Sequence, residues 1–153
     1  MSAGDVPLRR SRMKRRRRQP TRTERKCAAR SGAGATRPTN EVYTDGGCRG
    51  NPGVGGWAAL IFEGPKPKEI CGREQQTTNN RMELRAAIEG LKALEKPSKV
   101  RLFSDSAYLI NCMNEAWYAK WERNGWKNSK KKPVENANLW RELLKLARRH
   151  EVK

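Results

Sequence analysis

Residues 42–62 read VYTDGGCRGNPGVGGWAALIF, and this stretch contains two candidate strands around a turn. Residues 42–44 predict a short first strand that ends at Asp45, and residues 56–62 predict a second strand. The glycines and the proline between them are typical of a turn. After a proline-containing break, residues 68–75 can form a third strand. Because the three segments follow one another closely, we expect an antiparallel meander.

A helix and a fourth strand are predicted downstream. Thr77 or Thr78 can cap a helix that continues to about residue 94, since either hydroxyl can accept a hydrogen bond from the first turn. Residues 100–104, VRLFS, predict a fourth strand that stops at Asp105. A strand, a helix and a strand in this order predict a parallel pair. The apolar residues of the helix recur at helical spacing and predict one buried face, made of Met82, Ala86, Ala87, Leu91 and Leu94.

The remainder of the chain predicts two more helices. We expect residues 106–118 to be helical, and after Pro133 a last helix over residues 136–149. Residues 151–153 look like the first residues of another strand. The predicted fold class is therefore α/β, with a mixed sheet of three antiparallel strands and one parallel strand flanked by helices. The expected inward positions of the last helix are Leu139, Trp140, Leu143, Leu144 and Ala147.

The chain of 153 residues carries a net charge of +18, concentrated at its N-terminus. Residues 1–38 contain 13 Lys or Arg and 2 acidic residues, a net +11, and few large apolar residues. We predict that they form a disordered basic tail, with a binding arm, a targeting sequence, a solvated tail and a mis-assigned start as open alternatives. Residues 39–153, the expected single domain, keep a net +7. This balance favours a nucleic-acid partner, and solubility alone is the ordinary alternative.

Cysteine spacing and hydropathy indicate the expected compartment and the relation to membranes. The cysteines lack the spacing of a zinc ribbon or a redox motif, so we expect four reduced thiols in a cytoplasmic compartment. No apolar run approaches the roughly 20 residues that span a bilayer, so no membrane association is expected. His150 has no partner motif and is expected at the surface. The four cysteines are Cys27, Cys48, Cys71 and Cys112.

Three carboxylates fall at positions that the predicted fold brings together. Asp45 ends the first strand, Glu83 lies in the first turns of the helix, and Asp105 ends the fourth strand. The carboxyl ends of parallel strands meet at one edge of a sheet, where open α/β sheets bind ligands. Clustered carboxylates favour hard divalent cations, and such a cluster facing phosphates is typical of two-metal hydrolysis. Taken singly, each acid also fits a turn or a helix cap.

Four motifs resemble those of the ribonuclease H type 1 family in order and spacing. They are YTDGGCRGNPGVGGWA (residues 43–58), TTNNRMEL (77–84), FSDSAYLI (103–110) and WYAKWERNGWKNSKKKPVENANLW (117–140). The resemblance covers residues 41–153. It implies a ribonuclease H-like fold and an endonuclease that hydrolyses the RNA strand of an RNA–DNA hybrid, leaving 3′-OH and 5′-phosphate ends.

The resemblance also implies roles for single residues. Asp45, Glu83 and Asp105 match three of the family's four metal-binding carboxylates, which implies Mg²⁺ or Mn²⁺ as the cofactor. Contacts to the RNA strand are implied for Asn51, Asn79 and Asn80, whose amides suit a 2′-hydroxyl. A pocket for a DNA phosphate is implied for Thr78 and Asn136. The family's pocket also uses an Arg at the position where this chain has Gln76. We therefore expect a weaker contact with the DNA phosphate here.

The family's basic protrusion, which lies along the DNA strand, matches the segment after residue 117. Trp117 is expected to pack on a deoxyribose as well as on the protein, whereas Trp121 and Trp126 are expected to be mainly structural. Flat aromatics beside cations are typical of a nucleic-acid surface. The polar residues of the protrusion are Lys127, Ser129, Lys130, Lys131 and Lys132.

The family continues past the last helix with a fifth strand, a loop with a His, a fourth Asp and a C-terminal helix, and we expect these to be missing here. The fourth strand would then have one unpaired edge, which favours self-association of an otherwise monomeric protein. Beside the active endonuclease, two alternatives follow: a hybrid-binding protein with impaired catalysis, and a truncated fragment without the fourth catalytic Asp.

Overall fold

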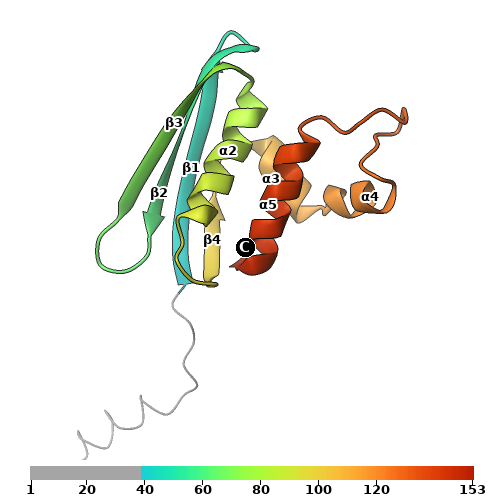
Figure 1. The fold of residues 1–153 in the computed structure, drawn as a ribbon. Coiled ribbons are helices and arrows are strands. Elements are labelled where there is room, and N and C mark those ends of the chain that lie inside the picture. The colour runs from blue at the N-terminus through green and yellow to red at the C-terminus, as the bar shows by residue number, and fades with distance from the viewer. Residues whose placement is uncertain (1–38) are drawn as a thin grey trace, which may run out of the picture. The chain divides into compact units, whose positions relative to one another are not determined.

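The computed structural model describes residues 39–153, and its centre is a five-stranded mixed sheet (Figure 1). The strand order is β3-β2-β1-β4-β5. The strands are β1 (Thr39–Arg49), β2 (Gly53–Phe62), β3 (Lys68–Thr77), β4 (Lys99–Phe103) and β5 (Glu151–Val152). The expected basic tail lies outside the described residues.

The first three strands form the predicted antiparallel meander, and β4 is parallel to β1. The expected turn over residues 46–53 is shorter than predicted, because β1 continues to Arg49 and only residues 50–52 connect it to β2. Gly46 pairs with Trp57 and Cys48 pairs with Gly55 in that extension. Gly46, Gly47 and Gly55 therefore belong to paired strands, and only Gly50 lies in the turn.

One face of the sheet is covered by α2 (Asn79–Lys92), with α5 (Ala137–Arg149) beside it (Figure 1). Thr78 caps α2, as predicted, because its hydroxyl accepts a hydrogen bond from the Arg81 N–H at 3.3 Å. The predicted apolar face of α2 is buried in full. In α5, Ala147 is only half-buried, and the other four expected positions are buried. The two helices and the sheet share one hydrophobic core, which includes Val42, Ile61, Leu84, Ile88, Leu91, Val100, Trp140 and Leu143.

The predicted helix over residues 106–118 is two helices, α3 (Ala107–Asn114) and α4 (Trp117–Arg123). Ala116 separates them with a left-handed backbone, φ 52°. From α4 onward the chain projects away from the sheet before α5 begins (Figure 1). Trp121 packs against Trp126 and Trp140, with ring centroids 6.0 and 5.9 Å apart, which confirms a structural role for Trp121 and Trp126.

Two expectations are wrong: that His150 lies at the surface, and that the fourth strand has one unpaired edge. His150 is buried, with 5% of its surface exposed, and its Nδ1 accepts a hydrogen bond from the Ser98 N–H at 3.2 Å. The strand predicted to start at residue 151 is present as β5, and its backbone bonds to β4 between Ser98 and Leu102. That edge of β4 is therefore paired over most of its length. Among the described residues, no helix is both long and apolar enough to cross a membrane.

Candidate metal and nucleic-acid site

The three predicted carboxylates meet at one place. One oxygen each from Asp45, Glu83 and Asp105 lies within 4.8 Å of the other two. Asp45 comes from β1, Asp105 follows β4, and α2 brings Glu83 between them, as the parallel pairing of β1 and β4 requires. The two aspartates are exposed and Glu83 is buried. Three carboxylates at this spacing match the ligand chemistry of a hard divalent cation.

Burial and like charge both act on Glu83. Burial, and after it the nearby charges of Asp105 and Asp45, raise the pKa of its carboxyl to about 7. Hydrogen bonds from the Gly46 N–H and from Ser104 Oγ, the latter at 3.5 Å, lower the pKa in part. Like charges this close oppose ionisation of Glu83, and a divalent cation between the three carboxylates would relieve their repulsion.

Glycine at position 46 makes this cluster possible. A Cβ on Gly46 would lie 2.6 Å from the backbone nitrogen of Glu83 and closer still to Met82, so the backbones of β1 and α2 touch here. Such contact is available only to glycine. Gly46 was predicted to lie in a turn, and the only sequence signal for its contact with α2 is a glycine directly after a strand-ending aspartate.

The loop after β1 and the start of α2 are joined through two asparagines expected to contact RNA. Asn79 Oδ1 accepts a hydrogen bond from the Cys48 N–H at 2.7 Å, and Asn51 Oδ1 accepts one from the Asn79 N–H at 3.2 Å. Both side chains are exposed, and their amide NH₂ groups donate to no protein atom in the described part of the chain. Asn80, the third expected residue, is half-buried in the first turn of α2.

The two residues expected to hold a DNA phosphate also lie together. Thr78 caps α2, Asn136 immediately precedes α5, and Arg81 connects them. The Arg81 N–H donates to Thr78 Oγ1, and Arg81 Nη1 donates to Asn136 Oδ1, each at 3.3 Å. Nothing in the local sequence indicates the position of Arg81, because its partner Asn136 is 55 positions away.

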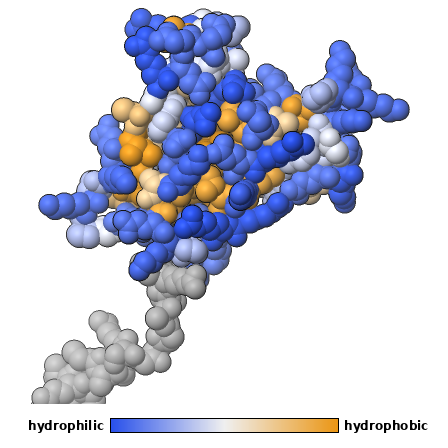
Figure 2. All heavy atoms as spheres, viewed as in Figure 1, coloured by the Kyte–Doolittle hydropathy of each residue, from blue (hydrophilic) through white to orange (hydrophobic). Residues whose placement is uncertain are grey.

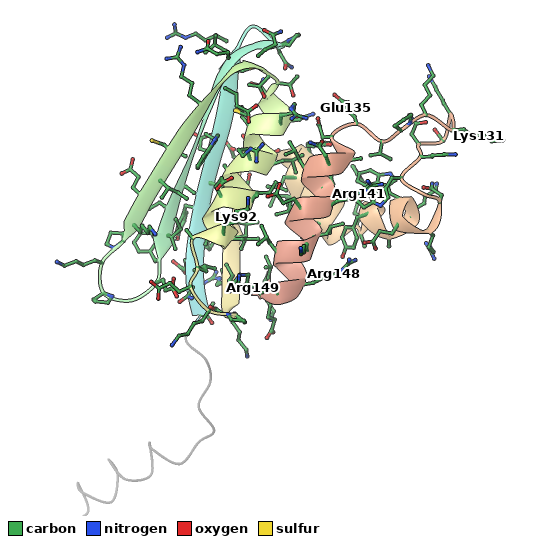
Figure 3. The ribbon with its side chains drawn as sticks, in the orientation of Figure 1. Lys92, Lys131, Glu135, Arg141, Arg148 and Arg149 are labelled. Atoms are coloured by element: carbon green, nitrogen blue, oxygen red, sulfur yellow. The ribbon has the colours of Figure 1, made fainter. Side chains whose placement is uncertain are left out.

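The expected basic protrusion presents its polar side chains to solvent. Asn128 Oδ1 accepts hydrogen bonds from the N–H groups of Lys130 and Lys132, at 2.9 and 3.0 Å, which holds the turn closed. All five polar residues expected to bind DNA here are exposed. Figure 3 shows Lys131 at the outer end of the loop, and Figure 2 shows hydrophilic residues along it. Arg141 lies over the Trp126 ring, 5.0 Å from its centroid, and supports the base of the loop.

Trp117, at the start of α4, is 38% exposed, which leaves part of its ring available to a ligand. Its Nε1 donates to the Glu115 carboxylate at 2.7 Å. This bond across the left-handed Ala116 fixes the orientation of the indole. The role of Glu115 was missed, because an exposed acid within a basic segment carries no sequence signal.

The ribonuclease H family model matches residues 37–153. The chain belongs to the ribonuclease H family. A ribonuclease H of Caldanaerobacter subterraneus subsp. tengcongensis is 63% identical over 113 residues, which cover 73% of each protein. A ribonuclease H of Moorella thermoacetica is 58% identical over 111 residues, covering 72% of this chain and 73% of that one.

Solved ribonuclease H structures agree with the fold. The crystal structure of LC9-RNase H1, described as a type 1 RNase H with the type 2 active-site motif, matches with a TM-score of 0.67 and 30% identity. The match covers 79% of this chain and 63% of that one, so this ribonuclease H spans somewhat less than two thirds of the solved chain. The resemblance to ribonuclease H type 1 and the predicted mixed α/β fold are both confirmed.

Proposed function

We propose that this protein is a divalent-metal-dependent endonuclease that hydrolyses the RNA strand of RNA–DNA hybrids and leaves 3′-OH and 5′-phosphate ends. The observation that carries the proposal is the cluster of Asp45, Glu83 and Asp105, within 4.8 Å of one another in a chain of the ribonuclease H family. Phosphodiester hydrolysis needs an activated water and compensation of the phosphate charge. Without a cation, three carboxylates would repel a phosphate.

The donor set fits Mg²⁺ first and Mn²⁺ second, because carboxylate oxygens favour both ions. When bound there, divalent cations supply a lowered pKa for a water and charge compensation for the attacking and leaving oxygens. Asp45 and Asp105, both exposed, face the solvent from which a nucleic acid arrives. The Gly46 N–H and Ser104 Oγ donate hydrogen bonds to the Glu83 carboxylate and hold it in place. One oxygen of Glu83 lies close to an oxygen of each aspartate, where it can bind the same cation.

Recognition of the two strands is assigned to different sets of residues around this cluster. We assign the RNA strand to Asn51, Asn79 and Asn80, because the free NH₂ groups of Asn51 and Asn79 can donate to a 2′-hydroxyl oxygen, which DNA lacks. The DNA strand is assigned to the protrusion. Trp117 offers a flat apolar surface that suits a deoxyribose, and the exposed lysines 127, 130, 131 and 132 offer charge for phosphates. The same strand is assigned to Ser129, Thr78 and Asn136.

A substrate comparison tests the proposal. The full chain is mixed with end-labelled RNA–DNA hybrid, double-stranded RNA or double-stranded DNA of one sequence, in Mg²⁺ or in EDTA. Internal cuts in the RNA strand of the hybrid alone, present in Mg²⁺ and absent in EDTA, are the expected result. Preferential binding of the hybrid without cleavage would show a binding protein instead. Equal cleavage of all three duplexes would refute the proposal.

A further inference from the structure

β3 is the outermost strand at one edge of the sheet, and no strand of the described residues pairs with its outer side (Figure 1). On its inner side, β3 pairs regularly with β2 from Lys68 to Glu74. Alternate residues of such an edge strand direct their N–H and C=O groups away from the sheet. This stretch of β3 therefore offers a row of backbone donors and acceptors to another strand.

The usual protections of an edge strand are few in β3. Edge strands commonly avoid further pairing by being short, by containing proline, or by irregular pairing. β3 has ten residues and no proline, and its irregular pairing with β2 lies beyond Glu74. The opposite edge of the sheet differs, because β5 has only two residues. Charged side chains are the remaining protection of β3, so the pattern of these charges decides which partner the edge accepts.

The charges of β3 are self-complementary about Cys71. Residues 68–74 read KEICGRE, with Lys68 and Glu69 on one side of the cysteine and Arg73 and Glu74 on the other. In an antiparallel pair of two copies centred on Cys71, Lys68 lies opposite Glu74, and Glu69 lies opposite Arg73. Two-fold symmetry repeats both pairs, so every charge of this segment meets an opposite charge. Opposite charges directly across two strands stabilise their pairing, and like charges oppose it.

Neighbouring registers lose this match. A shift by two residues is the smallest that keeps every side chain on its own face of the sheet. Glu69 then lies opposite Cys71 for one direction of the shift and opposite Gln75 for the other. Arg73 lies opposite Pro67 or Cys71. The charge pattern therefore selects the register centred on Cys71.

The side chains of this segment are available to a second copy. Lys68, Glu69 and Arg73 are exposed, and none of them forms an ion pair among residues 39–153. Glu74 is half-buried and pairs with Arg85 of α2 at 3.4 Å, which holds its carboxylate near the edge. An exposed pair contributes little by itself, so the backbone hydrogen bonds supply the attraction and the charges supply the choice of partner.

The centre of the segment adds an apolar contact. A Cβ on Gly72 would lie 2.5 Å from the Trp57 ring, so this ring lies across the glycine. In the register centred on Cys71, Ile70 of the second copy is opposite Gly72, on the face that carries the Trp57 ring. Because glycine has no side chain, Ile70 can extend toward the ring. Cys71 itself is an exposed free thiol.

We propose that two copies of this chain associate through β3, in an antiparallel pairing centred on Cys71 that joins their sheets into one. The occupant of the edge is a second copy because one segment supplies both halves of every charge pair, as a two-fold interface requires. A two-fold axis normal to the sheet keeps α2 of both copies on the same side. The interface contains none of the residues assigned to catalysis or to hybrid binding, so this inference does not depend on the proposed function.

Sedimentation equilibrium over a concentration series tests the association in the full chain. Wild type should form a dimer as its concentration rises. Glu69→Arg or Arg73→Glu alone should weaken dimerisation about tenfold, because two symmetry-related pairs change from attraction to repulsion. The double variant, Glu69→Arg with Arg73→Glu, should restore it. The matched control is Glu95→Arg, which changes net charge as Glu69→Arg does, is exposed and lies outside β3. It should leave dimerisation unchanged.

Thiol cross-linking tests the register. In a chain with Cys27→Ser and Cys48→Ser, a short bis-maleimide should join two chains through Cys71, which faces itself across the axis, whereas Cys112 is buried. Adding Cys71→Ser should abolish the cross-linked product. A monomer at every concentration, a dimer that the single charge reversals do not weaken, or a dimer without the Cys71 product would overturn the inference. Circular dichroism of each variant at low concentration establishes that it is folded.

Discussion

Gly46 and Glu83 touch through their backbones: a Cβ on Gly46 would lie 2.6 Å from the nitrogen of Glu83. The strand that carries Asp45 and the helix that carries Glu83 are thus in direct backbone contact. The same contact lets the Gly46 N–H reach the Glu83 carboxylate. The spacing of the carboxylate cluster therefore depends on a residue without a side chain.

Gly46→Ala should separate β1 from α2, because the new methyl group meets backbone atoms that cannot turn aside. We expect a loss of about 1–3 kcal/mol in the free energy of unfolding, the typical range for overpacking, and loss of cleavage in whatever protein remains folded. Gly47→Ala is the matched control, since its nearest neighbour is Asn79 Oδ1 at 3.9 Å. Urea denaturation measures both variants. Equal stability of the two would show that the contact is not tight.

Glu83→Gln should stabilise the metal-free protein above neutral pH. The folded pKa of Glu83, about 7, exceeds the ordinary 4.5, so ionising Glu83 opposes folding. Wild type therefore loses stability as pH rises from about 4.5 to 7, by about 2–3 kcal/mol at the upper end. Gln cannot ionise, so the two proteins should melt alike near pH 4.5, and the variant should melt several degrees higher at pH 8 in EDTA.

The informative quantity is the difference in melting temperature between wild type and Glu83→Gln. His150 titrates in both proteins, so its contribution to that difference cancels. Mg²⁺ should raise the melting temperature of wild type at pH 8 more than that of Glu83→Gln, because the carboxylate gains a charge partner. A melting difference that does not change with pH would contradict the account of this carboxyl.

Replacing Lys130, Lys131 and Lys132 by Gln should weaken hybrid binding and flatten its salt dependence. Each lost phosphate contact should lower the slope of log affinity against log salt by about 0.9. The control replaces Lys66, Lys68 and Lys96, which are equally exposed, lie outside the protrusion and carry the same total charge. If both triple variants change the slope equally, the protrusion acts only through net charge.

Trp117→Ala should reduce the preference for a hybrid over double-stranded RNA, because a 2′-hydroxyl on the second strand would obstruct packing on the indole. Glu115→Gln, which weakens the 2.7 Å bond that orients the ring, should shift the preference in the same direction and by less. Competition binding with the two duplexes measures the preference. An unchanged ratio for Trp117→Ala would remove the indole from strand selection.

Local patterns predicted the parts of the fold that depend on nearby residues. The buried face of α2 follows from helical spacing of Met82, Ala86 and Leu91, and the carboxylate cluster follows from strand ends in a parallel pair. The sequence did not reveal features that depend on distant partners. His150 is buried because Ser98, 52 positions away, donates to it. Arg81 is oriented by Asn136 in the same long-range way.

Other features were missed because the residue type is a poor guide to its conformation. Ala116 adopts a left-handed backbone and divides the predicted helix, although alanine favours helix interiors. The glycines from 46 onward suggested a loop, whereas all but Gly50 lie in paired strands. In both places tertiary packing decides the backbone conformation, which local propensity does not predict.

The most direct test of the carboxylate site is a Mg²⁺ titration of hybrid cleavage by wild type and by Asp105→Asn. The amide keeps the size of the side chain and removes its charge, so cleavage should be lost at every Mg²⁺ concentration while affinity for the hybrid stays within a few fold. Full cleavage by Asp105→Asn, or cleavage by wild type in EDTA, would contradict the proposal that Asp45, Glu83 and Asp105 hold the catalytic metal.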